Sequence, residues 1–126
     1  MLDIDQFGHS LHWLGFAQLW PEFQTDLDAC YSNAYTNSLW GWGYVGSYAM
    51  TNSGTVLSGL SAQPVINIIL LADEYFAEGL MSYFDVQYPY DPAAPATREQ
   101  LYSMDPMFYS FIDRWMYHNE WRGGCP

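Results

Sequence analysis

Positive charge is the property that this 126-residue chain has least of. It has no lysine and three arginines against 14 acidic residues, and its net charge is −11. Because the arginines are Arg98, Arg114 and Arg122, residues 1–97 carry ten acids and no base. Proteins that bind nucleic-acid phosphates use Lys and Arg to release counterions. The composition therefore excludes direct binding of nucleic acid, and every arginine salt bridge must involve the C-terminal quarter.

Cysteine is almost as scarce. Cys30 and Cys125 are too few for a disulfide scaffold and too far apart in the sequence for a Cys-x-x-Cys site. We expect two unrelated thiols. A bridge between them, which would fix the C-terminal tail, is the alternative.

Charge and long apolar runs are both missing from the middle of the chain. No charged side chain lies in the 44-residue segment 29–72, between Asp28 and Asp73. No window reaches the roughly 18 unbroken apolar residues of a membrane span, and no Lys or Arg flanks a candidate. We expect this segment to contribute to a buried core. A short membrane-penetrating hairpin is the alternative.

Motifs of the common enzyme and cofactor sites are absent. The chain has no G-x-S-x-G nucleophile motif and no phosphate-binding P-loop. Gly41, Gly43 and Gly46 have the spacing of a dinucleotide-binding loop, but no apolar strand precedes them and bulky Trp42 lies among them. We therefore expect no catalytic residue, no cofactor and no enzymatic activity.

Two histidines, His9 and His12, are spaced to lie one helical turn apart. Metal sites use such pairs, and an acid or a third histidine could complete one. The candidates for that role are Glu22, Glu74, Glu78 and His118. Di-iron bundles need two Glu-x-x-His pairs, and the chain has none. We expect His9 and His12 to face solvent and predict no metal site.

Asp73, Glu74 and Glu78 place carboxylates on successive turns of a predicted helix. Paired carboxylates can act as general acid and base when one of them is desolvated. Glu74 and Glu78 fall opposite the apolar stripe of that helix, so we expect a solvated helix face instead.

Helical periodicity and capping residues are the strongest positive signals. Phe7, Leu11 and Leu14 recur at helical spacing, Pro21 suits the first turn of a helix, and Asp105-Pro106 combines a cap with a first-turn proline. Thr97 with Gln100 forms a capping box. We predict a mainly α fold, with a single compact helical domain spanning residues 1–126. It has about four to six helices, long aromatic-rich loops, a Tyr/Pro loop at 85–96 and a C-terminal helix at 106–121.

Residues 39–49 fit two structures. Their aromatic and small residues alternate with strand period, but no second convincing strand exists to pair with them. We favour a closely packed helical segment.

The predicted core lies on the helix that Pro64 begins. One stripe of that helix, with Ile68, Ile69, Ala72 and Phe76, is expected to pack on the last helix through Phe108, Phe111 and Trp115.

Aromatic residues make up 19 % of the chain, more than a core of this size holds. Trp and Tyr are enriched at the centres of protein–protein interfaces, where they add buried area. We predict an interface formed by Trp40, Trp42, Tyr44, Tyr48, Tyr88, Tyr90, Tyr117 and Trp121.

These features favour a non-enzymatic structural or assembly subunit with protein partners, either copies of itself or other subunits of a larger assembly. A shell, connector, filament or small virion component would fit. One alternative is an acidic inhibitor that mimics nucleic acid and occupies a basic partner protein. Another is a small membrane-associated accessory subunit.

Overall fold

A computed structural model describes residues 4–41, 43–47, 49–50, 64–87 and 92–122. Helices are the only regular secondary structure in these ranges, which confirms the mainly α class. In chain order they are α1 (Ile4–Ser10), the π-helical η1 (Leu11–Phe16), α2 (Ala17–Leu19), α3 (Pro21–Thr36), α4 (Tyr44–Ser47), α6 (Pro64–Tyr83), α7 (Arg98–Met104) and α8 (Pro106–Trp115).

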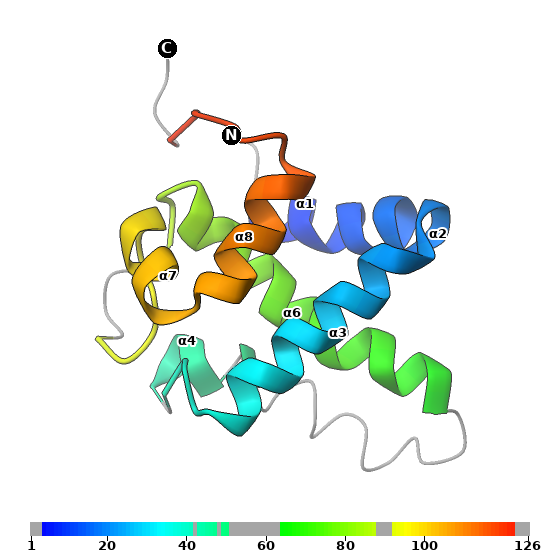
Figure 1. The fold of residues 1–126 in the computed structure, drawn as a ribbon, viewed down its shortest axis with the longest axis horizontal. Coiled ribbons are helices and arrows are strands. Elements are labelled where there is room, and N and C mark those ends of the chain that lie inside the picture. The colour runs from blue at the N-terminus through cyan, green and yellow to red at the C-terminus, as the bar shows by residue number, and fades with distance from the viewer. Residues whose placement is uncertain (1–3, 42, 48, 51–63, 88–91, 123–126) are drawn as a thin grey trace.

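Helix α6 is the element on which the others are assembled. It contacts α1, α3, α7 and α8, and α3 and α8 also contact each other. In Figure 1, α3 crosses in front of α6, while α1, η1 and α2 lie together at one end of the molecule and α4 and α7 lie at the other. We call α1, η1 and α2 the N-terminal arm.

Local sequence signals begin three of the helices where they were expected. Pro21 opens α3 after an extended Trp20. Asp105 accepts a hydrogen bond from the Phe108 N–H at the start of α8. Thr97 accepts from the Gln100 N–H at the start of α7. Side-chain acceptors satisfy backbone N–H groups that have no partner in the first turn of a helix, so these starts are local properties.

The last helix is shorter than predicted. It ends at Trp115 and not at residue 121, and Tyr117 and His118 follow with φ of 53° and 56°. This left-handed conformation breaks the helix and is rare outside Gly, Asn and Asp. No glycine or proline lies at this point of the sequence, so the predicted helix was too long.

The segment around residue 44 is helical, as we favoured: Tyr44–Ser47 form the single turn α4, and Ala49 and Met50 are helical as well. Gly41 has a φ of 63°, and Gly46 lies so close to the Trp40 carbonyl that a Cβ there would overlap its oxygen. The glycines therefore permit a close backbone approach within this segment.

Aromatic rings from α3, α6 and α8 meet in the core. The ring centroid of Phe23 lies 5.3 Å from that of Phe76, 5.0 Å from that of Phe111 and 5.1 Å from that of Trp115. Ala72 and Phe76 are buried, as are Phe108 and Phe111, which confirms the predicted packing of α6 on α8. The side chains of Ile68 and Ile69 lie outside the described residues.

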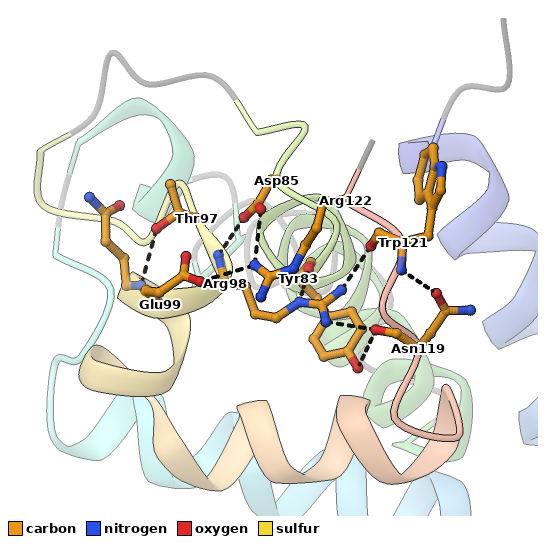
Figure 2. Close-up of polar contacts among 9 residues, drawn as sticks. Tyr83, Asp85, Thr97, Arg98, Glu99, Asn119, Trp121 and Arg122 are labelled. Atoms are coloured by element: carbon orange, nitrogen blue, oxygen red, sulfur yellow. Dashed lines mark hydrogen bonds and ion pairs between the residues drawn. The ribbon is translucent and has the colours of Figure 1, made fainter. Parts of the chain in front are cut away.

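Buried Arg98 fixes the chain that follows α8. Its guanidinium donates to the backbone carbonyls of Tyr83, Asn119 and Trp121 at 2.6, 2.6 and 2.9 Å, and lies over the Tyr83 ring. Figure 2 shows this side chain reaching between the end of α6 and the C-terminal segment. Arg98 therefore holds the non-helical segment that follows α8 in place, through the carbonyls of Asn119 and Trp121.

The other two arginines form exposed ion pairs within the chain. Arg114 lies 2.8 Å from Asp26, and Arg122 lies 3.0 Å from Asp85 and 3.1 Å from Glu99. Exposed pairs of this kind contribute about 0–1 kcal/mol.

We expect Phe111→Ala to lower the free energy of unfolding by about 3–5 kcal/mol, because it leaves a cavity between Phe23 and Phe76. Urea denaturation followed by circular dichroism measures the change. Ser110→Ala, at the exposed neighbouring position, is the control, and a loss below about 1 kcal/mol for Phe111→Ala would contradict the assigned core.

We expect Arg98→Met to destabilise the protein by at least about 2 kcal/mol, because hydrogen bonds to a charged group each contribute about 1.5–3 kcal/mol. Amide hydrogen exchange in residues 116–122 should accelerate as well. Arg122→Met, which removes an exposed arginine from the same segment, should change stability by less than about 1 kcal/mol. Equal effects of the two variants would contradict the role of Arg98.

Candidate functional site

Trp40, predicted at the interface, lies in the core. Its side chain is fully buried, and its indole N–H donates to the Asp105 carboxylate at 2.9 Å. Its ring also packs edge-on against Tyr75, with centroids 5.4 Å apart. A buried carboxylate needs hydrogen-bond donors, and Trp40 is one of them. This residue is therefore not available to a partner.

Two of the predicted interface residues are exposed, both after α8. Tyr117 is 90 % exposed, and the exposed Trp121 lies beside Phe84, with the ring centroids 5.4 Å apart. Tyr44 begins α4, but its side chain is outside the described residues. Trp42, Tyr48, Tyr88 and Tyr90 lie outside the described residues altogether.

The N-terminal arm carries exposed apolar side chains. Leu14 is 81 % exposed and Leu19 is 65 % exposed, and Trp20, which follows α2, is exposed as well. We call these three residues the arm surface. Leu14, which recurs with Phe7 and Leu11 at helical spacing, points to solvent.

Leu14 lies in the π-helical turn η1 (Leu11–Phe16). A π-helix bonds residue i to i+5, so it holds more residues per turn than an α-helix and shifts the register of the side chains. Within η1, Leu11 packs partly buried against the core while Leu14 points to solvent, and Phe7 on α1 is exposed as well. No residue pattern in the sequence marked this change.

Trp20 of the arm surface packs against two further aromatic rings. Phe16, Trp20 and Trp115 lie with their centroids 5.3–5.7 Å apart in each pair. The indole N–H of Trp115 is buried and has no hydrogen-bond partner among the described residues. These contacts hold Trp20 against α8, so its exposed side is presented on a fixed support.

A polar cluster lies on the inner side of the same arm. His12 is fully buried, its Nδ1 donates to the Asp73 Oδ1 at 2.8 Å, and its Nε2 lies 2.6 Å from the Gln24 Oε1. Gln24 in turn donates to Asp28 at 2.8 Å. The prediction that His12 faces solvent is wrong, because the arm turns it towards α3 and α6.

His9 shares the same carboxylate. Its Nδ1 donates to the Asp73 Oδ2 at 2.7 Å, and its Nε2 lies 3.6 Å from the Glu74 Oε1. Gly8 permits this approach, since a Cβ there would lie 3.0 Å from the Ala77 Cα on α6. One carboxylate thus joins two histidines of the arm to the central helix.

The carboxylates of α6 do not form a solvated face, as had been expected. Asp73 and Glu78 are buried, and Glu78 accepts a hydrogen bond from the Gln87 side chain. Because other elements surround α6, its polar side is covered too.

The thiol of Cys30 is buried and free, and it borders a shallow hollow of about 350 Å³ between α3 and α8. Burial, with the nearby negative charge of Asp105, raises the pKa of this thiol to about 12. It therefore stays protonated and is a poor nucleophile or metal ligand. Cys125 lies outside the described residues.

Asp105 is the most enclosed carboxylate among the described residues. It accepts from the Tyr75 hydroxyl at 2.6 Å, from the Trp40 indole and from the Phe108 N–H. Burial raises the pKa of Asp105 above its ordinary value of 3.8, although these hydrogen bonds oppose the rise. It also raises the pKa of Tyr75.

Comparison of the chain with protein-family models, with curated proteins and with solved structures gave no match. Within the described ranges, no helix combines the length and the apolar character needed to cross a membrane. The site is therefore described by its own geometry alone.

The raised pKa of Asp105 predicts a pH dependence of stability. Its contribution is fully present below pH 3.8, where the folded and unfolded states are both protonated, and declines as pH rises through the raised pKa. Relative to Asp105→Asn, which does not titrate, the free energy of unfolding of the wild type should therefore fall as pH rises above 4. Urea melts of both proteins between pH 4 and 8 measure this difference, and parallel curves would contradict the assignment.

Proposed function

We propose that this protein is a non-enzymatic assembly subunit that associates with further copies of itself through the arm surface. The observation that carries the proposal is the exposure of Leu14 and Leu19, at 81 % and 65 %, beside an exposed tryptophan. Burying a leucine side chain stabilises by about 1.5–3 kcal/mol relative to leaving it in water. An assembled state would recover that free energy.

A second copy is the occupant that the charge distribution favours. Residues 6–21, which contain the arm surface, have no acidic side chain, whereas the chain as a whole has a net charge of −11. Two acidic copies repel each other over most of their surfaces. An uncharged apolar surface is complementary to itself, as a two-fold contact requires.

The support behind the arm surface also suits an interface. Trp20 lies against Trp115 and Phe16, and Arg114 lies near the face of the Trp115 ring while pairing with Asp26. Interfaces concentrate their energy in a few well-supported aromatic residues surrounded by polar groups. The arm surface has this arrangement within one chain.

The alternative of a nucleic-acid mimic has less support. Such a mimic needs its acids on one outer face, and Asp73, Glu78 and Asp105 are buried inside the fold. The alternative of a membrane-associated subunit depends on part of segment 29–72, and residues 51–63 of that segment lie outside the described residues.

We expect the wild-type protein to form oligomers whose stability rises with salt, because salt screens the repulsion between acidic copies while the apolar contact remains. Leu14→Asp and Leu19→Asp should each weaken association by more than about 30-fold, corresponding to about 2 kcal/mol. Sedimentation velocity at 0.1 and 1 M salt, with circular dichroism of each variant, measures both effects.

Tyr102→Asp is the matched control, since it adds the same charge at an exposed aromatic position on α7, away from the arm. It should sediment like the wild type. A wild-type protein that remains monomeric at both salt concentrations would overturn the proposal. Oligomers that dissociate as salt rises would show that ionic contacts, and not the arm surface, hold the copies together.

A further inference from the structure

The histidine–carboxylate cluster on the inner side of the arm has the donor set of a metal site. His9, Asp73 and Glu74 each offer a nitrogen or oxygen atom, and these atoms lie within 4.8 Å of one another. The three residues come from two elements, α1 and α6. The close approach at Gly8 and Ala77 brings these elements together.

The position of His9 relative to its two carboxylates distinguishes their roles. Its Nδ1 donates to Asp73 at 2.7 Å, so the neutral ring carries its lone pair on Nε2. That nitrogen lies 3.6 Å from the Glu74 Oε1. Two ligands on a tetrahedral zinc ion are about 3.4 Å apart when the bonds are about 2.1 Å long. The Nε2–Oε1 pair is therefore spaced to share one ion.

Asp73 accepts a hydrogen bond from the His9 Nδ1, as an orienting carboxylate does from the second nitrogen of a metal-bound histidine. In such sites the second ring nitrogen donates to a carboxylate, which fixes the tautomer and makes the ligand nitrogen more basic. Asp73 is itself held, because its other oxygen accepts from the buried His12. His12 has both ring nitrogens directed at Asp73 and Gln24, so it belongs to the support and not to the ligand set.

Solvent can reach the site. The side chains of His9 and Glu74 are 19 % and 21 % exposed, so an ion can enter and water can fill its remaining positions. Imidazole nitrogen and carboxylate oxygen are ligands that zinc takes readily, whereas calcium and magnesium favour oxygen alone.

We propose that His9 Nε2 and Glu74 bind a divalent zinc ion, with Asp73 as the positioning residue that orients His9. The ion lies between the imidazole Nε2 and the Glu74 carboxylate, which are 3.6 Å apart. It joins α1 to α6 at the crossing where Gly8 meets Ala77. This site is separate from the arm surface and does not depend on self-association.

Isothermal titration of the chelator-treated full chain with zinc chloride at pH 7 tests the proposal. The wild type should bind one zinc ion per chain at the site, and zinc should raise its Tm, because an ion that binds only the folded state stabilises it. His9→Gln and Glu74→Gln should each abolish this binding. His118→Gln is the matched control, since His118 also donates to a carboxylate, that of Asp113, but is exposed.

The role of Asp73 is tested separately. Asp73→Asn keeps an acceptor for His9 but loses the charge, and it should weaken zinc binding by about 10- to 100-fold. Nitrogen-15 NMR of the histidine rings should show zinc on Nε2 of His9 in the wild type. A purely structural effect of Asp73 would alter stability without affecting which nitrogen binds.

Several outcomes would overturn the proposal. These are no zinc binding by the wild type, unchanged binding by His9→Gln or Glu74→Gln, or a loss of binding in His118→Gln alone. If His9→Gln fails to fold by circular dichroism, Glu74→Gln decides, because Glu74 is the more exposed of the two ligands.

Discussion

The buried carboxylate of Asp105 is the constraint on which the core depends. An ionised group inside a protein is costly unless hydrogen bonds replace the water that it has lost. Tyr75 and Trp40 supply two of these bonds at 2.6 and 2.9 Å, and the N–H of Phe108 supplies a third. One side chain thereby fixes the start of α8 against the middle of α6 and against the turn before α4.

Other buried carboxylates of this chain, which has almost no cations, are also satisfied by hydrogen-bond donors that are not Lys or Arg. Two histidines donate to Asp73 and a glutamine donates to Glu78, so these carboxylates are satisfied without Lys or Arg. The one buried arginine, Arg98, donates instead to backbone carbonyls. Part of the aromatic excess is explained in this way, because Trp40 and Tyr75 bring a donor together with apolar volume.

Sequence reasoning succeeded where the determinants are local. The starts of α3, α7 and α8 depend on residues within one turn of Pro21, Thr97 and Asp105, and those residues can be read directly. The inward direction of His12, the burial of Trp40 and the early end of α8 depend on partners far away in the sequence. The pairs His12–Asp73 and Trp40–Asp105 are separated by 61 and 65 positions, and no local pattern specifies them.

The number of residues in the π-helical turn η1 determines which side of α2 faces solvent. A π turn amounts to one residue more than an α-helix would use over the same span, and each residue of an α-helix turns the chain by about 100°. Relatives that differ by a single insertion or deletion between Leu11 and Phe16 would therefore present a different side of α2 to water while keeping every leucine. In this part of the chain, a change of length alone would alter which apolar side chains are exposed, with the composition untouched.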